Sequence, residues 1–228
     1  MDSRHKLSHR EEEFLEYRDA LTSELAAVKF HLRIWKQVLP SATDYPAEVS
    51  EARVFFLFTI RAHLYTALMQ LSKIVDKREK ALSIWNFLNL AKRSQGIFSD
   101  KRFLRRVVAK YGYGEQVEGL IKSHLLVTSR TVEVDRDKLD SLKEAIEDLE
   151  AWRDKQSGHV DIESMLGDAS IAEQYRILVE KSEEILRTLV DILNRYSMAY
   201  DATEQSIDIP FESSLSWVLD SVRSRLNL

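Results

Sequence analysis

The chain has 228 residues, of which 44% are apolar and 31% are charged, and its formal net charge at pH 7 is −4. This length supports one domain with a sizeable core, and the balance of residue types is that of an ordinary soluble protein. The absence of cysteine excludes disulfides and thiolate metal sites. The net negative charge excludes a general attraction to nucleic acid, so any such binding depends on a local patch. Because the N-terminal segment lacks the apolar core of a signal peptide and no apolar run approaches the length of a membrane span, we expect a cytoplasmic protein with no membrane partner.

The first third of the chain predicts two long helices. Ser8 and Glu11 have the spacing of a capping box, and the apolar pattern after them predicts a helix that stops before Pro40. Pro46 suits the first turn of the next helix. That helix runs to Val75 and is apolar over much of its circumference, so we expect it to lie centrally.

The middle third has a less regular pattern. Ser83 and Ser99 are candidate caps of two short helices, and residues 115–126 have helical character. Residues 128–134 have an extended or loop-like pattern. We interpret residues of about 80–134 as a helical insertion.

The last third again predicts long helices. A stripe at three- and four-residue spacing begins near Asp135 or Asp137 and comprises Leu139, Leu142, Ile146, Leu149 and Trp152. Ser170 and Glu173 then form a second capping-box pair, and a tail helix follows. We therefore expect an all-α protein: a single domain over 1–228, built as an antiparallel bundle of four main helices with the insertion at 80–134 and a C-terminal arm at about 207–228.

Arg153 and His159 are the candidate catalytic residues, with Asp154 beside the arginine. A guanidinium is a permanent cation suited to holding phosphate, and an imidazole suits proton transfer near neutral pH. The spacing alone is weak evidence for a site, because Arg4 and His9 also fit it. The alternative interpretation is a solvated helix end whose cation interacts with the helix dipole. Arg153 and His159 lie between the two helices with the clearest apolar pattern, and this position favours the catalytic interpretation.

This combination resembles the HEPN superfamily, whose ribonuclease branch carries an arginine, an adjacent polar residue and a histidine after four to six residues. The phrase from Arg153 to Asp161 is most similar to the AbiU type of abortive-infection HEPN protein. A second likeness is the segment Leu71-Ser72-Lys73-Ile74-Val75-Asp76 with Leu82-Ser83-Ile84. One departure is Asp161, which stands where nucleotidylated HEPN toxins carry a tyrosine.

The resemblance implies metal-independent RNA cleavage by attack of the ribose 2′-OH on the adjacent phosphate, with no cofactor. His159 is then the general acid or base, Arg153 stabilises the charged phosphorane, and Asp154 orients one of them. The resemblance also implies a homodimer with composite sites, an RNA substrate, and an antitoxin protein or a phage-defence setting.

A basic segment is the candidate RNA-binding surface. Residues 92–110 hold seven basic residues and one acid, including Lys101, Arg102, Arg105 and Arg106. The alternative is a solvated face that pairs with the acidic residues at 144–150.

His31 and His63 lie inside long helices, where a packed or hydrogen-bonded role is favoured. The sequence contains no residue spacing typical of a metal site.

Two rival functions stay open at the level of sequence. One is a non-catalytic HEPN-like dimer that serves as a binding or regulatory scaffold. The other is a helical nucleotide-binding protein without RNA contact.

Overall fold

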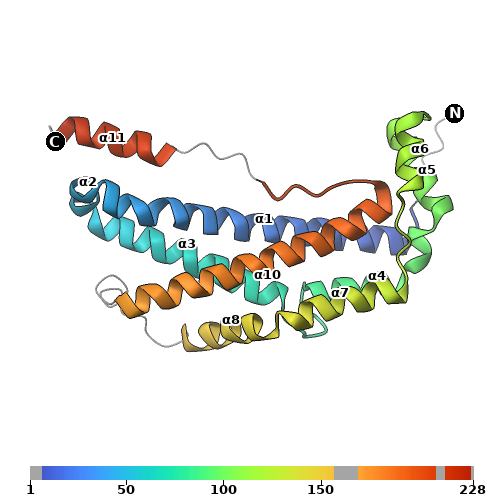
Figure 1. The fold of residues 1–228 in the computed structure, drawn as a ribbon, viewed down its shortest axis with the longest axis horizontal. Helices are drawn as coiled ribbons and strands as arrows, with labels where there is room; N and C mark the ends of the chain where they lie inside the picture. Colours follow the sequence, from blue (N-terminus) through green and yellow to red (C-terminus); the bar gives the residue numbers. More distant parts are fainter. Residues whose placement is uncertain (1–6, 157–168, 209–213, 227–228) are drawn as a thin grey trace.

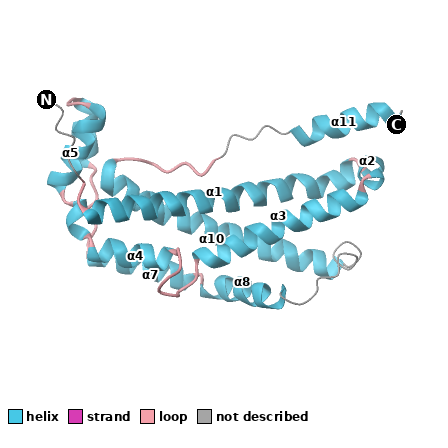
Figure 2. Ribbon diagram, turned by 180° about the vertical axis from the view of Figure 1, so that it is seen from behind, coloured by secondary structure: helices cyan, strands magenta, loops and turns pink. Residues whose placement is uncertain are grey.

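The structure, a computed structural model, describes residues 7–156, 169–208 and 214–226, apart from the side chains of 39–43, 155–156, 169–174, 214 and 226. Within these ranges the regular elements are helices, with no strand (Figures 1 and 2). The predicted all-α class is therefore confirmed.

Four long stretches of helix form an antiparallel bundle. Three are single helices: α1 (His9–Asp44), α3 (Arg53–Ile74) and α10 (Ala169–Asp201). The fourth consists of α7 (Ser129–Ser141) and α8 (Lys143–Gln156), which follow one another end to end (Figure 1). The short α2 (Pro46–Glu51) turns the chain from α1 into α3.

The remaining helices lie beside the bundle or at its ends. Helix α4 (Ile84–Arg93) packs on α1 and α7, and a 3-10 turn at Gln95–Phe98 follows it. Helices α5 (Asp100–Tyr111) and α6 (Glu115–Lys122) pack on each other at one end of the bundle, and α11 (Ser214–Leu226) lies against α2 at the other (Figure 1).

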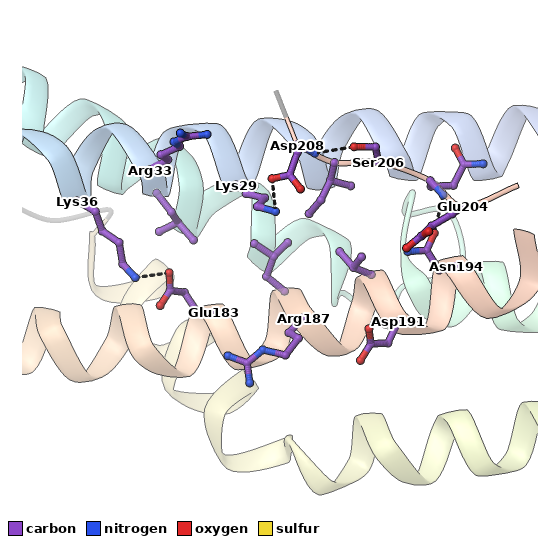
Figure 3. A pocket seen from close by; sticks show the side chains of 15 residues that line it. Lys29, Arg33, Lys36, Glu183, Arg187, Asp191, Asn194, Glu204, Ser206 and Asp208 are labelled. Carbon is purple, nitrogen blue, oxygen red and sulfur yellow. Dashed lines mark hydrogen bonds and ion pairs between the residues drawn. The ribbon is translucent and has the colours of Figure 1, made fainter. Parts of the chain in front are cut away.

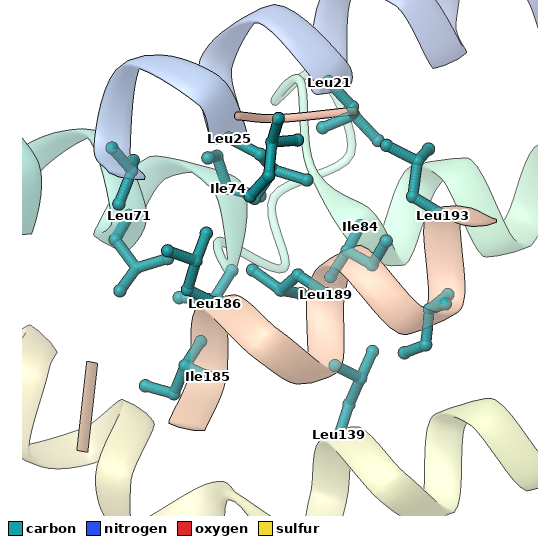
Figure 4. Close-up of a cluster of buried hydrophobic side chains, with 14 of the residues drawn as sticks. Leu21, Leu25, Leu71, Ile74, Ile84, Leu139, Ile185, Leu186, Leu189 and Leu193 are labelled. Atoms are coloured by element: carbon teal, nitrogen blue, oxygen red, sulfur yellow. The ribbon is translucent and has the colours of Figure 1, made fainter. Parts of the chain in front are cut away.

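The core runs along the bundle axis and receives side chains from each long helix. Figure 4 shows its middle part, where side chains of α1, α3, α4, α7 and α10 interdigitate, including Leu21, Leu25, Leu71, Ile74, Ile84, Leu139, Ile185 and Leu189. At one end the fully buried Phe14 ring contacts three aromatic rings at centroid distances of 5.0–5.5 Å, those of Phe87, Phe98 and Tyr200. Burial of apolar area on this scale is the main driving force for the fold.

Local signals place several helix starts correctly. Ser8 donates from its backbone N–H and its hydroxyl to the Glu11 carboxylate, at 3.0 and 2.7 Å. Ser83 accepts from the Asn86 N–H at the start of α4, at 3.4 Å. The predicted cap at Ser170 falls among side chains that the structure does not describe.

The predicted end of the first helix before Pro40 is wrong, since α1 continues to Asp44. Proline inside a helix removes one N–H bond and crowds the carbonyl four residues earlier, at a cost of about 3 kcal/mol, so contacts outside the helix must offset it. The added turn is held from outside, because Arg223 of α11 donates to the Asp44 carbonyl at 3.1 Å.

The predicted extended segment at 128–134 is also wrong, because α7 begins there. Thr128 and Thr131 form a reciprocal capping box, with both bonds at 3.2 Å. Val132 and Leu139 are fully buried on one face of this helix. Tertiary burial thus overrides the extended preference of β-branched residues. The stripe predicted as one helix is divided at Leu142, between α7 and α8.

The expectation that the second long helix lies centrally holds for only part of its length. Its C-terminal half contacts α1, α8 and α10, and Leu68 and Leu71 are fully buried. In its N-terminal half only one face is buried, through Phe56 and Ile60, whereas Val54 and Phe55 on the outer face are 67% and 66% exposed.

Candidate functional site

Arg153 lies in the last turn of α8, with its side chain 30% exposed. Its Nε donates to the Asp154 carboxylate at 3.0 Å, and the Asp154 side chain is 71% exposed. The preceding residue, Trp152, packs against the Tyr65 ring of α3 with centroids 5.7 Å apart. Arg153 is thus fixed at its base by an aromatic contact, and its guanidinium reaches the surface. The predicted partner His159 lies outside the described residues.

The end of α3 supplies a buried carboxylate on the same side of the bundle. Asp76 is 8% exposed, and its carboxylate accepts from the backbone N–H and the Nε of Arg78 at 2.8 and 2.6 Å. The side-chain bond from Arg78 is the main cause that lowers the pKa of Asp76, and the charge of Arg153 lowers it further. Asp76 is therefore ionised near neutral pH and lies within electrostatic range of Arg153.

Helix α8 runs antiparallel to α3, which brings the first half of α8 to the end of α3. The start of α8 lies beside Asp76, and its end lies beside Tyr65. Trp85 directly follows the Leu82-Ser83-Ile84 part of the second likeness, and its Nε1 donates to the Val75 carbonyl at 3.0 Å. Two parts of the sequence that are about 70 residues apart therefore border one region of the surface.

A cleft of about 460 Å³ opens between these segments. Its lining comprises Val75, Asp76, Lys77, Arg78, Trp85, Leu139, Asp140, Lys143, Ile146, Glu147 and Glu150. Lys77 lies over the Trp85 ring at 4.4 Å, a cation–π contact. The cleft thus offers an aromatic surface with charges of both signs, next to the helix that carries Arg153.

The basic segment divides into buried and exposed side chains. Arg106 has a side chain that is only 12% exposed, and its guanidinium donates to the Tyr200 carbonyl at 2.7 Å and to Glu11 at 2.9 Å. It also lies 3.8 Å from the centre of the Tyr200 ring. Arg102 forms a second ion pair with Glu11 at 3.2 Å. The donors of Arg106 are thus engaged within the protein, whereas Lys101 and Arg105 point to solvent as exposed residues.

The acidic residues at 144–150 do not supply the counter-charges of the basic segment. Glu144 and Asp148 instead receive Lys181 of α10, at 3.1 and 2.5 Å. The basic segment pairs with α1 and α7, through Glu11, Glu13 and Glu133. The predicted pairing of this segment with residues 144–150 is therefore wrong, and its ion pairs with α1 and α7 leave Lys101 and Arg105 exposed.

A larger cleft lies away from Arg153 and was not anticipated from the sequence. It measures about 790 Å³ between α1 and α10, under residues 204–208 (Figure 3). Lys29 pairs with Asp208 at 2.6 Å and Lys36 pairs with Glu183 at 2.5 Å across its rim. The spacing of Lys29, Arg33 and Lys36 along one helix face was the available signal.

Within the described ranges, no three His, Asp or Glu side chains lie close enough together to hold a metal ion. The arrangement around Arg153 is instead a cation held beside carboxylates at a helix end. Such a guanidinium is suited to phosphate.

The antiparallel bundle, with its arginine at the end of α8, agrees with the helical bundle expected of a HEPN protein. The AbiU2 family model matches residues 11–219, which covers most of the chain. The chain therefore belongs to the AbiU2 family of HEPN proteins, and the resemblance stated from its motifs is confirmed. Comparisons with curated proteins and with solved structures find no significant match.

Proposed function

We propose that this protein is a metal-independent endoribonuclease that acts in phage defence or as the toxin of a toxin–antitoxin pair. The observation that carries the proposal is the position of Arg153, at an exposed helix end within an AbiU2-family bundle. The family is named for abortive infection, and growth arrest through RNA cleavage is a direct way to achieve it.

The proposed reaction is transesterification within the RNA chain. His159 removes the proton of a ribose 2′-OH, whose oxygen attacks the adjacent phosphorus while the bond to the 5′ oxygen of the next nucleotide breaks. The leaving 5′ oxygen takes up a proton, and the products are a 2′,3′-cyclic phosphate and a 5′-OH end. General acid–base catalysis of this kind contributes about 10²–10⁴-fold in rate.

Arg153 stabilises the negative charge that develops on the phosphorane. Its bond to Asp154 at 3.0 Å restrains the guanidinium, and the nearby charge of Asp76 favours a fixed orientation. These two carboxylates act through Arg153, so we assign them positioning roles.

The site is completed by a second copy of the chain. Each copy contributes one Arg153 and one His159, and a two-fold axis brings two such pairs to one RNA strand. Lys101 and Arg105 are exposed in the basic segment and contribute phosphate contacts. An antitoxin protein that restrains cleavage belongs to the same proposal.

The test is growth of cells that express the chain from an inducible promoter. The wild type should arrest growth, whereas Arg153→Ala and His159→Ala should not. Arg130→Ala is the matched control, because Arg130 is an exposed arginine on α7 that should leave arrest unchanged. Arrest by His159→Ala at the wild-type level would contradict the proposal.

The rival is a non-catalytic HEPN dimer that acts as a scaffold. The exposed Trp217 of α11, 71% accessible, favours an interaction role for the arm under either view. A scaffold would still arrest or regulate growth when Arg153 and His159 are replaced, so the same experiment separates the two.

A further inference from the structure

An apolar stripe runs along the outer face of α3. It comprises Val54, Phe55, Phe58, Ala62 and Tyr65, and we refer to these five residues as the α3 stripe. Val54, Phe55, Phe58 and Tyr65 are 67%, 66%, 57% and 40% exposed, and Ala62 is also exposed. From Phe55 onward, the intervals are three, four and three residues, the spacing of a seam between two packed helices. Large exposed apolar patches on soluble proteins mark interaction surfaces.

We propose that the α3 stripe binds the α3 stripe of a second copy, antiparallel, about a two-fold axis near residue 60. The proposal rests on the dimer of the proposed function and names the surface that forms it. In this register Phe55 faces Tyr65 of the second copy, and Phe58 faces Ala62 of the second copy. A large ring against a methyl group lets the helices approach closely, and a two-fold contact uses the same patch on both copies.

The area of the stripe suits a dimer that also uses neighbouring elements. At the stated exposures, its four large side chains present about 400 Å² in each copy. A stable interface buries about 800 Å² on each partner. The α3 stripe thus supplies roughly half, and the adjoining end of α8 lies in position to supply more, since Trp152 packs directly on Tyr65.

The antiparallel register brings a charged residue to each end of the stripe. The exposed Arg53 of the second copy falls beside Tyr65 and the end of α8, where the carboxylate of Asp154, which also accepts from Arg153, is 71% exposed. Opposite charges at an interface rim fix register and orientation. In parallel packing, Arg53 would instead meet Arg53.

The same register places both Arg153 side chains at the border of one interface. Tyr65 and its equivalent in the second copy are ten residues apart along the helix axis, a distance of about 15 Å. Since Arg153 follows the residue that packs on Tyr65, the two candidate sites flank the α3 contact. Loss of this contact therefore separates the two copies of the catalytic motif.

A lipid surface is the other occupant to consider, because α3 is long and apolar enough to cross a membrane by length and composition. Its most apolar window has a mean hydropathy of 1.3, and 33% of it is buried inside the protein. Interfacial helices present a broad apolar face with basic residues opposite. Here the opposite face of α3 packs in the core through Phe56, Ile60 and Leu64, which leaves a narrow stripe suited to another helix.

The first test is the mass of the full chain in solution by light scattering. The wild type should have twice the mass of its 26.5 kDa chain. Phe55→Ser with Phe58→Ser should weaken the dimer at least tenfold and keep the helical circular dichroism, because both side chains are more than half exposed. Tyr113→Ser is the matched control: it removes a comparably exposed aromatic between α5 and α6, at 78% exposure, and should leave the dimer intact. A double variant that stays dimeric at wild-type affinity would overturn the proposal.

The second test measures the register of the two α3 helices by cysteine cross-linking. The chain has no cysteine of its own, so only the introduced thiols can form a disulfide. A mixture of Phe55→Cys and Tyr65→Cys proteins should form a disulfide-linked dimer under mild oxidation, at least tenfold faster than either protein alone. Equal or faster cross-linking of Phe55→Cys to itself would exclude the antiparallel arrangement.

Three further outcomes separate this proposal from the ribonuclease. A wild type that is monomeric at 100 µM (roughly a hundred times a micromolar Kd) and binds anionic phosphatidylserine vesicles through the stripe would overturn the dimer surface. A stripe variant that is dimeric and cleaves RNA would overturn the surface and leave the ribonuclease intact. A monomeric stripe variant that no longer cleaves RNA would support both.

Discussion

The imidazoles of His31 on α1 and His63 on α3 face each other with their Nδ1 atoms 2.7 Å apart. One ring must donate and the other accept, so the contact requires that at least one imidazole is neutral. Burial lowers the pKa of both histidines, and the charge of His31 lowers that of His63 further. The pair lies in the contact between the two longest antiparallel neighbours of the first half of the chain.

This pair predicts a loss of stability in mild acid. Because both pKa values are lower in the folded state than the ordinary 6.5, the unfolded chain takes up protons first as the pH falls. The stabilisation is therefore complete above about pH 7 and decreases as the pH falls through about 6.5. Urea unfolding at pH 7.5 and pH 5.5 measures it. His63→Gln should flatten this dependence and His9→Gln, at an exposed position, should keep it. An unchanged slope in His63→Gln would count against the assignment.

Arg106 is predicted to stabilise the fold, unlike its exposed neighbour Arg105. Arg106→Ala removes a guanidinium from between Glu11 and the Tyr200 carbonyl, and the Glu11 side chain is only 3% exposed. We expect a loss of about 3 kcal/mol in the free energy of unfolding, as for other broken buried pairs. Arg105→Ala should change it by less than about 0.5 kcal/mol.

RNA affinity after charge reversal at Arg105 provides the complementary measurement. Arg105→Glu should weaken RNA binding and reduce its salt dependence, because one phosphate contact is lost. If charge reversal at Arg105 leaves affinity and salt dependence unchanged, the basic segment is a solvated face and not an RNA contact.

A buried ion pair holds α7 to α10. Asp135 is fully buried and pairs with Arg195, and Lys138 lies 3.7 Å away. Burial raises the pKa of Asp135, although both cations act in the opposite direction. Arg195→Met should therefore cost about 3 kcal/mol, since it leaves a poorly compensated carboxylate. Adding Asp135→Leu should recover most of that loss, and a strictly additive double variant in thermal unfolding would show that the pair is not coupled.

The long helices and their caps were predictable because they depend on local patterns. Ser8 with Glu11 and the apolar spacing of α10 are signals that the sequence carries by itself. The end of α1 was not predictable in the same way, because its last turn contacts α11, where Arg223, about 180 residues later, donates to the Asp44 carbonyl. The extended prediction for residues 128–134 was wrong because β-branched residues such as Thr128 locally favour extended backbone. The helix found there depends on the burial of Val132, which the tertiary packing provides.

In the candidate site, too, some features follow from local sequence patterns and others depend on tertiary packing. Motif spacing identified Arg153 and Asp154, and their side-chain bond is present. The effect of the Arg153 charge on the pKa of Asp76 depends on the antiparallel packing of α3 and α8, which no local pattern specifies. The engagement of Arg106 by Glu11 also required the fold, because the two residues are about 95 positions apart.

The most direct test of metal-independent ribonuclease activity is cleavage of RNA by the purified protein in the presence of EDTA. The wild type should produce fragments that end in a 2′,3′-cyclic phosphate and begin with a 5′-OH, identified by mass spectrometry. Arg153→Ala and His159→Ala should each reduce the rate by about 10²-fold or more while the unfolding curve stays unchanged. Cleavage that persists at the wild-type rate in either variant, or a wild type that cleaves RNA only with added metal, would contradict it.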